Sequence, residues 1–130
     1  MRFEWDPEKD KENRLQVSHL GIMSYYNYNS SDFEVVGNTG ALLMIRKQIF
    51  EKCGFFNENY IECFEDVELN LTCITLGFKN YLSSKSVAFH YESKTRNDNE
   101  NKIKNLIDDY NTRLFPFINS KINKIAPYIR

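Results

Sequence analysis

Two adjacent carboxylates, Glu65 and Asp66, stand directly before an apolar stretch that begins at Val67. If a helix begins here, its dipole and its free amide groups favour the ionised form of both carboxylates. An ionised, positioned carboxylate can act as a general base that takes a proton from an attacking hydroxyl. Acidic pairs are also common at helix starts without any catalytic role. Taken alone, the pair fits a plain N-terminal charge pattern better than a catalytic one.

The hydrophobic pattern upstream of this pair predicts a strand and a helix. Residues 41–45 form a continuous apolar run of strand length, which is typical of a strand covered on both faces. In residues 46–53 the apolar side chains recur at helical spacing, and Gly54 follows where helices commonly end. We therefore expect a strand that leads into a short helix.

Residues 67–76 fit both a strand alternation and a helical stripe, so periodicity alone does not decide between them. The acidic pair before this stretch and Gly77 after it favour a helix. Residues 78–91 contain two apolar groups interrupted by serines, which indicates two short strands or one kinked strand.

The two ends of the chain differ in their hydrophobic periodicity. Residues 1–34 show little periodicity and are predicted to be irregular, with one short strand within residues 15–22. Residues 103–114 have the spacing of an amphipathic helix, which we expect Pro116 to stop. A second helix is predicted from residue 118 to just before Pro127.

Composition excludes several classes of protein. The 130 residues are 42% apolar and 27% charged, which is ordinary for one globular domain. The net charge of −1 argues against nucleic-acid binding. No apolar run approaches the roughly 18 residues of a membrane span, and the charged residues 1–6 lack the apolar core expected of a signal peptide. We expect a cytoplasmic protein, with the inner face of the membrane as an alternative location. The three cysteines should be small buried or half-buried apolar residues.

Four short motifs follow one another between residues 35 and 96. They are Thr39-Gly40-Ala41-Leu42-Leu43-Met44-Ile45-Arg46, Cys53-Gly54-Phe55-Phe56-Asn57-Glu58, Phe64-Glu65-Asp66-Val67-Glu68-Leu69 and Val87-Ala88-Phe89-His90-Tyr91-Glu92-Ser93. In type and order they resemble the motifs of the acceptor-side, carboxy-terminal half of family-2 glycosyltransferases. The resemblance implies an α/β fold of GT-A type: a partial mixed sheet with flanking helices, then a C-terminal helical segment.

The resemblance also implies roles for individual residues. Asp66 stands at the position of the catalytic base, and Glu65 beside it contacts the acceptor or orients the loop. Thr39, Gly40, Ala41 and Arg96 are the candidate substrate-binding residues, the first three because small residues let a sugar approach the backbone. The sequence departs from the family pattern in having Asn57 and Glu68 where Asp is usual, and Thr72 where Arg is common.

His90 is a candidate metal ligand by the same resemblance. In some relatives a His at this position completes the coordination of a divalent metal, Mg²⁺ or Mn²⁺, that neutralises the departing diphosphate. The other ligands come from a D-x-D motif, and this chain has none suited to that role. One His cannot hold an ion that prefers oxygen ligands. We expect the metal in the complete enzyme and none tightly bound to this chain; the alternative is a satisfied histidine at a strand end.

The chain is thus divided into an irregular segment (1–34), an acceptor-side α/β core (35–96) and C-terminal helices (97–130). The implied function is transfer of a sugar from a nucleotide-diphosphate donor to a bacterial surface glycan or glycoprotein. Without a nucleotide-binding half, the isolated chain should be inactive. The alternative is a non-catalytic module that binds protein or glycan. We also expect self-association, because the strand at 41–45 would lack its neighbours.

Overall fold

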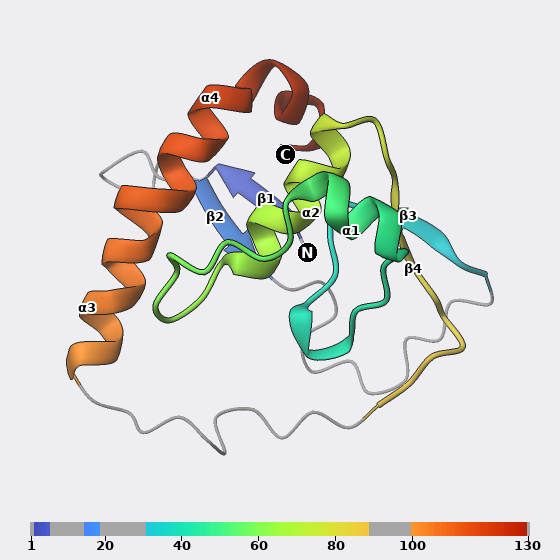
Figure 1. Ribbon diagram of the computed structural model, residues 1–130, viewed down its shortest axis with the longest axis horizontal. Helices are drawn as coiled ribbons and strands as arrows, with labels where there is room; N and C mark the ends of the chain where they lie inside the picture. Colours follow the sequence, from blue (N-terminus) through green and yellow to red (C-terminus); the bar gives the residue numbers. More distant parts are fainter. Residues whose placement is uncertain (1, 6–14, 19–30, 89–99, 130) are drawn as a thin grey trace.

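The computed structural model describes residues 2–5, 15–18, 31–88 and 100–129 (Figure 1). In these ranges the strands are β1 (Arg2–Trp5), β2 (Leu15–Ser18), β3 (Phe33–Val35) and β4 (Asn80–Leu82). The α-helices are α1 (Lys47–Cys53), α2 (Glu65–Thr75), α3 (Glu100–Asp109) and α4 (Phe115–Ile125). Short 3-10 turns occur at Gly40–Leu42 and Ala126–Tyr128, and a π-helical turn at Tyr110–Leu114 joins α3 to α4. The predicted α/β class with a C-terminal helical segment is confirmed.

The described strands pair as two antiparallel ribbons. In one, β1 pairs with β2 and Phe3 lies opposite Val17; in the other, β3 pairs with β4 and Glu34 lies opposite Tyr81. Phe3 also forms an isolated parallel bridge with Ile129, which ties the chain's two ends together. The short strand expected within residues 15–22 is β2, whereas β1 had no signal in the sequence pattern.

The core lies where α2 meets β1 and the helices of the C-terminal segment. Figure 1 shows α3 and α4 running one after the other as a long rod beside α2, with β1 and β2 near them. The buried side chains that form the core come from β1, α2, the π-helical turn and α4: Phe3, Val67, Leu71, Ile74, Tyr110, Leu114, Ile118 and Ile125. Each fully buried aliphatic side chain contributes about 1.5–3 kcal/mol relative to exposure. The core therefore fixes α2 against the rod.

Both helices predicted in the middle of the chain are confirmed, and each ends at the expected glycine. Gly54, which directly follows α1, has φ 82°. Gly77, which follows the α2 C-cap residue Leu76, has φ 85°. This left-handed conformation closes the last turn of a helix and strains residues that have a Cβ. The ambiguous stretch of residues 67–76 is helical, and its alternating apolar residues are buried because α2 packs on several sides.

The strand predicted at residues 41–45 is wrong. Thr39 accepts hydrogen bonds from two amides ahead of it, Ala41 N–H through its hydroxyl and Leu42 N–H through its carbonyl, and these bonds close a 3-10 turn. The apolar run is not covered on both faces, since the Leu42 side chain is 55% exposed and that of Met44 is 97% exposed. An apolar run predicts burial only if the fold supplies cover.

Pro116 does not stop the helical segment, contrary to expectation. The π-helical turn Tyr110–Leu114 changes the hydrogen-bond register just ahead of it, and the Phe115 amide donates to the Tyr110 carbonyl. Pro116 thereby falls in the first turn of α4, where a missing N–H is tolerated. The second helix ends at Ile125, before Pro127, as predicted.

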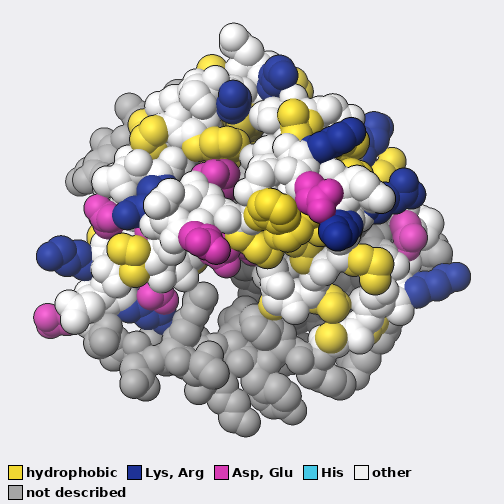
Figure 2. Space-filling model, viewed as in Figure 1, with side chains coloured by type: hydrophobic (Ala, Val, Ile, Leu, Met, Phe, Trp, Pro, Cys, Tyr) yellow, Lys and Arg dark blue, Asp and Glu magenta, His cyan; other side chains and the backbone are white. Residues whose placement is uncertain are grey.

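Of the strands expected within residues 78–91, the structure contains β4, and a turn follows it at residues 83–86. Residues 89–91 lie outside the described ranges. None of the described helices has the length and apolar character needed to cross a membrane. Hydrophobic side chains gather near the middle of the face drawn in Figure 2, with acidic and basic side chains around them.

Candidate functional site

The carboxylate of Asp66 lies against the backbone of the Thr39–Ala41 turn. The Gly40 amide donates a hydrogen bond of 2.7 Å to Asp66 Oδ2. A Cβ at position 40 would lie 3.3 Å from Asp66 Cβ, closer than most real contacts of that kind. Residues that are 26 positions apart are thus in contact, and three predicted substrate-binding residues adjoin the predicted base. Among the described residues, nothing donates to Asp66 Oδ1.

The start of α2 carries both acidic residues in an unusual backbone setting. Phe64, the N-cap residue, has φ 81° and gives no side-chain cap. A bulky residue in this conformation costs about 1–3 kcal/mol and persists only where surrounding contacts enforce it. The ring of Phe64 packs edge-on against Tyr110, with 6.0 Å between centroids. Glu65 and Asp66 therefore follow a strained residue that the C-terminal rod holds in place.

Asn70, one turn after Asp66, connects α2 to the loop that carries the glycine turn. Its side chain accepts from the Asn38 amide at 3.1 Å and donates to the Asn38 carbonyl at 2.8 Å and to the Asp66 carbonyl at 2.7 Å. Asn80 of β4 extends the network by donating to the Val36 carbonyl at 2.9 Å. Asn70 is 3% exposed, so these bonds are protected from water. They fix the position of the Thr39–Ala41 turn relative to Asp66.

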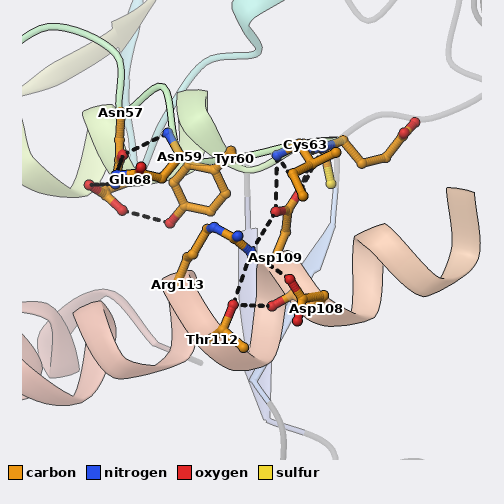
Figure 3. Close-up of polar contacts among 11 residues, drawn as sticks. Asn57, Asn59, Tyr60, Cys63, Glu68, Asp108, Asp109, Thr112 and Arg113 are labelled. Carbon is orange, nitrogen blue, oxygen red and sulfur yellow. Dashed lines mark hydrogen bonds and ion pairs between the residues drawn. The ribbon is translucent and has the colours of Figure 1, made fainter.

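Two of the departures from the family pattern contact each other (Figure 3). Asn57 donates to Glu68 Oε1 at 3.1 Å, and the Tyr60 hydroxyl donates to Glu68 Oε2 at 2.6 Å. If position 57 were Asp, two carboxylates would face each other, which is destabilising. Burial, then the hydrogen bond to Glu68, raises the pKa of Tyr60 well above its ordinary value. Glu68 is thus held by two neutral donors next to α2's first turn.

The other predicted site residues lie outside the described residues. His90 and Arg96 fall within residues 89–99, so the metal-binding role of His90 and the substrate-binding role of Arg96 stay predictions. In the ranges the structure describes, no three His, Cys, Asp or Glu side chains gather as a metal site.

A cavity of about 360 Å³ is lined in part by Asn38 and Asn70, and its lining does not include Asp66 or Gly40. Its lining includes Arg46, Cys73 and Tyr81. Burial, then the neighbouring Cys53, raises the pKa of the Cys73 thiol to about 12, so Cys73 stays a protonated thiol at neutral pH. The expectation of buried or half-buried cysteines is confirmed for all three.

Comparison with known proteins gives one similarity over part of the chain. A stretch of 58 residues, 45% of this chain, is 33% identical to the O-antigen biosynthesis protein RfbC of Myxococcus xanthus. The matched stretch corresponds to 4% of that protein's length. No protein-family model matches the chain, and no solved structure matches it.

The sequence pattern identified Asp66 as the candidate base but did not identify the residues that hold it in place. Asn70 interrupts the apolar residues of α2 with a polar side chain, and that interruption was the available signal. Polar residues inside a buried helical stripe need partners, which predicts a network even when its members are unknown.

Proposed function

We propose that this chain is the acceptor-side portion of a glycosyltransferase that transfers a sugar from a nucleotide-diphosphate donor to a bacterial surface glycan or glycoprotein. The observation that carries the proposal is the contact between Asp66 and the Gly40 amide. It joins a carboxylate at a helix start to a turn of small residues, and the family resemblance assigns these two features to the base and to the acceptor side.

In the proposed reaction Asp66 accepts the proton of the acceptor hydroxyl. The hydroxyl oxygen forms a bond to the anomeric carbon of the donor sugar as the bond from that carbon to the diphosphate oxygen breaks. The nucleoside diphosphate leaves with the electron pair, and the proton goes to the carboxylate. Gly40 holds Oδ2, and since no residue in the described ranges donates to Oδ1, we assign Oδ1 as the oxygen that receives the proton.

The Thr39–Ala41 turn provides the proposed acceptor surface. Its backbone is exposed at Gly40 and Ala41, and a glycine lets a sugar ring approach the main chain closely. The similarity to an O-antigen biosynthesis protein supports a glycan as the acceptor class. A nucleotide-binding half would supply the donor, and Mg²⁺ or Mn²⁺ bound there, with His90 as a proposed ligand, would neutralise the diphosphate.

The test uses an enzyme that contains residues 1–130 together with a nucleotide-binding half. It would be incubated with a panel of nucleotide-diphosphate sugars and with bacterial lipid-linked glycans or lipopolysaccharide. We expect one donor to release its nucleoside diphosphate while the acceptor gains the mass of one sugar. Glycan binding without transfer from any donor would overturn the proposal and favour a non-catalytic binding module. The isolated chain serves as the control and should not transfer.

A further inference from the structure

We propose that Asp109 is a positioning residue for Asp66, acting through the backbone of residues 61–63. The inference rests on the proposed role of Asp66 as the base. Asp109 ends α3 and its side chain is 0% exposed, although it is a carboxylate. A buried carboxylate is destabilising unless several donors satisfy it. Its donors come from the loop that leads into α2.

Three consecutive amides converge on this one side chain (Figure 3). The Ile61 amide donates to both carboxylate oxygens at 3.0 Å, and Oδ2 also accepts from Glu62 at 2.6 Å and from Cys63 at 3.2 Å. Arg113, one helical turn on, donates to Oδ1 at 3.0 Å. Backbone donors to a carboxylate form strong, charge-assisted bonds. We refer to this arrangement of Asp109 with residues 61–63 as the Asp109 clamp.

The π-helical turn provides the geometry of the clamp. Arg113 lies within that turn and reaches back to both Asp108 and Asp109, while Tyr110 beside Asp109 packs on Phe64. π-Helical turns of this kind are frequent at functional sites. The rod thus holds the loop at residues 61–63 through Asp109 and holds Phe64 through Tyr110.

Only Phe64 and Glu65 separate the clamped amides from Asp66. Since both the clamp and the Phe64 ring contact are made by residues 109–113, the direction in which α2 begins is set by the rod. Asp66 Oδ2 in turn binds the Gly40 amide at 2.7 Å. The position of the base relative to the acceptor turn therefore depends on Asp109, with which Asp66 forms no direct contact.

The Gly40 amide offers a direct report on Asp66, because its exchange with solvent depends on the bond to Oδ2. The experiment compares amide hydrogen exchange by NMR in the wild-type chain and in Asp109→Asn, in which an amide NH₂ replaces an acceptor oxygen. We expect exchange to rise about 10- to 100-fold at residues 61–63 and at Gly40, with the α2 core amide of Leu71 unchanged. Asp108→Asn is the matched control: Asp108 binds the same Arg113 but accepts from none of the three loop amides, and wild-type exchange is expected at Gly40.

A rise at residues 61–63 with wild-type exchange at Gly40 would overturn the proposal, since the clamp would then be structural only. No change at residues 61–63 would overturn it as well. If the amides of Asp109→Asn exchange faster everywhere, including at Leu71, Arg113→Gln decides: it removes the charged partner of Asp109 Oδ1, together with the bonds of Arg113 to Asp108 and Thr112, and so loosens the carboxylate that the three amides share. Exchange must then rise at Gly40 together with residues 61–63, and a rise at neither or at only one of them contradicts the proposal.

These exchange measurements do not involve sugar transfer, so they test the positioning role of Asp109 independently of the proposed function. If Asp66 were not the base, the exchange results would be unaffected. In an enzyme that transfers sugar, Asp109→Asn should lower kcat by roughly 10-fold or more and leave the KM for donor near its wild-type value. A lower kcat with an equal rise in donor KM would contradict a role confined to positioning the base.

Discussion

At the scale of the residue, Gly40 shows how tightly the candidate base is enclosed. Replacing it with Ala places a methyl group 3.3 Å from Asp66 Cβ, so the carboxylate or the turn must shift by a few tenths of an ångström. We expect Gly40→Ala to lower the transfer rate of a complete enzyme by roughly 10-fold, since small misplacements of catalytic groups cost up to about 100-fold. A crystal structure of the variant would check the displacement. An unchanged rate would show that the turn does not position the base.

Tyr60 provides a second test at this scale through the pH dependence of stability. Its pKa is raised in the folded state, so the folded protein holds this proton more tightly than the unfolded chain does. The stabilisation is complete below the unfolded pKa of about 10 and is lost as the pH rises above it. The difference in unfolding free energy between wild type and Tyr60→Phe should therefore shrink between about pH 9 and pH 11. Urea denaturation at both pH values measures it, and a constant difference would contradict the assigned shift.

At the scale of the element, Asn70 joins α2 to the loop before the glycine turn. Asn70→Ala removes three bonds and leaves the Asn38 N–H and C=O without their partner side chain. We expect a loss of about 2–3 kcal/mol in the free energy of unfolding, because buried unsatisfied groups cost about 1–3 kcal/mol each. Chemical denaturation checks this, with the exposed Asn119→Ala of α4 as control. Equal stabilities of the two variants would show that the network contributes nothing.

Helices were predictable at this scale where local chemistry decides them. Gly54 and Gly77 end α1 and α2 because only glycine adopts their positive φ without strain. The strand at residues 41–45 could not be judged in this way, since an apolar run does not reveal whether the fold will cover it. The π-helical turn before Pro116 could not be predicted from the sequence either. It depends on the contact that Tyr110 makes with Phe64, which is distant in the sequence.

At the scale of the whole molecule, the acidic pair and the small-residue turn were identifiable from their motifs, but what holds them was not. Asp109 lies 46 to 48 positions after the amides it binds, and Asn70 lies 32 positions after Asn38. No local pattern encodes such pairs. The sequence pattern thus predicts which residues could do chemistry, whereas the tertiary fold determines where they point.

Exposed apolar side chains in and beside the glycine turn bear on whether whole molecules associate with one another. Leu42 is 55% exposed and Met44 97% exposed. We expect the isolated chain to self-associate, most simply as a twofold dimer that covers these side chains. Analytical ultracentrifugation across a concentration range should show a dimer that Met44→Lys weakens, while Lys85→Met, at an exposed position in the turn after β4, does not. A concentration-independent monomer for the wild type would contradict this.

The central claim, that Asp66 takes the acceptor proton, is tested most directly by the single-turnover transfer rate of Asp66→Asn. The measurement uses a complete enzyme at saturating donor. Asp32→Asn is the matched control, because Asp32 lies outside the site and, among the residues that the structure describes, accepts hydrogen bonds from Ser84. Asp66→Asn keeps the size of the side chain and one acceptor oxygen but removes the proton acceptor. We predict a rate lower by about 10²- to 10⁴-fold with donor affinity unchanged, and a wild-type rate for the control. Near-normal transfer by Asp66→Asn would mean that the base lies elsewhere.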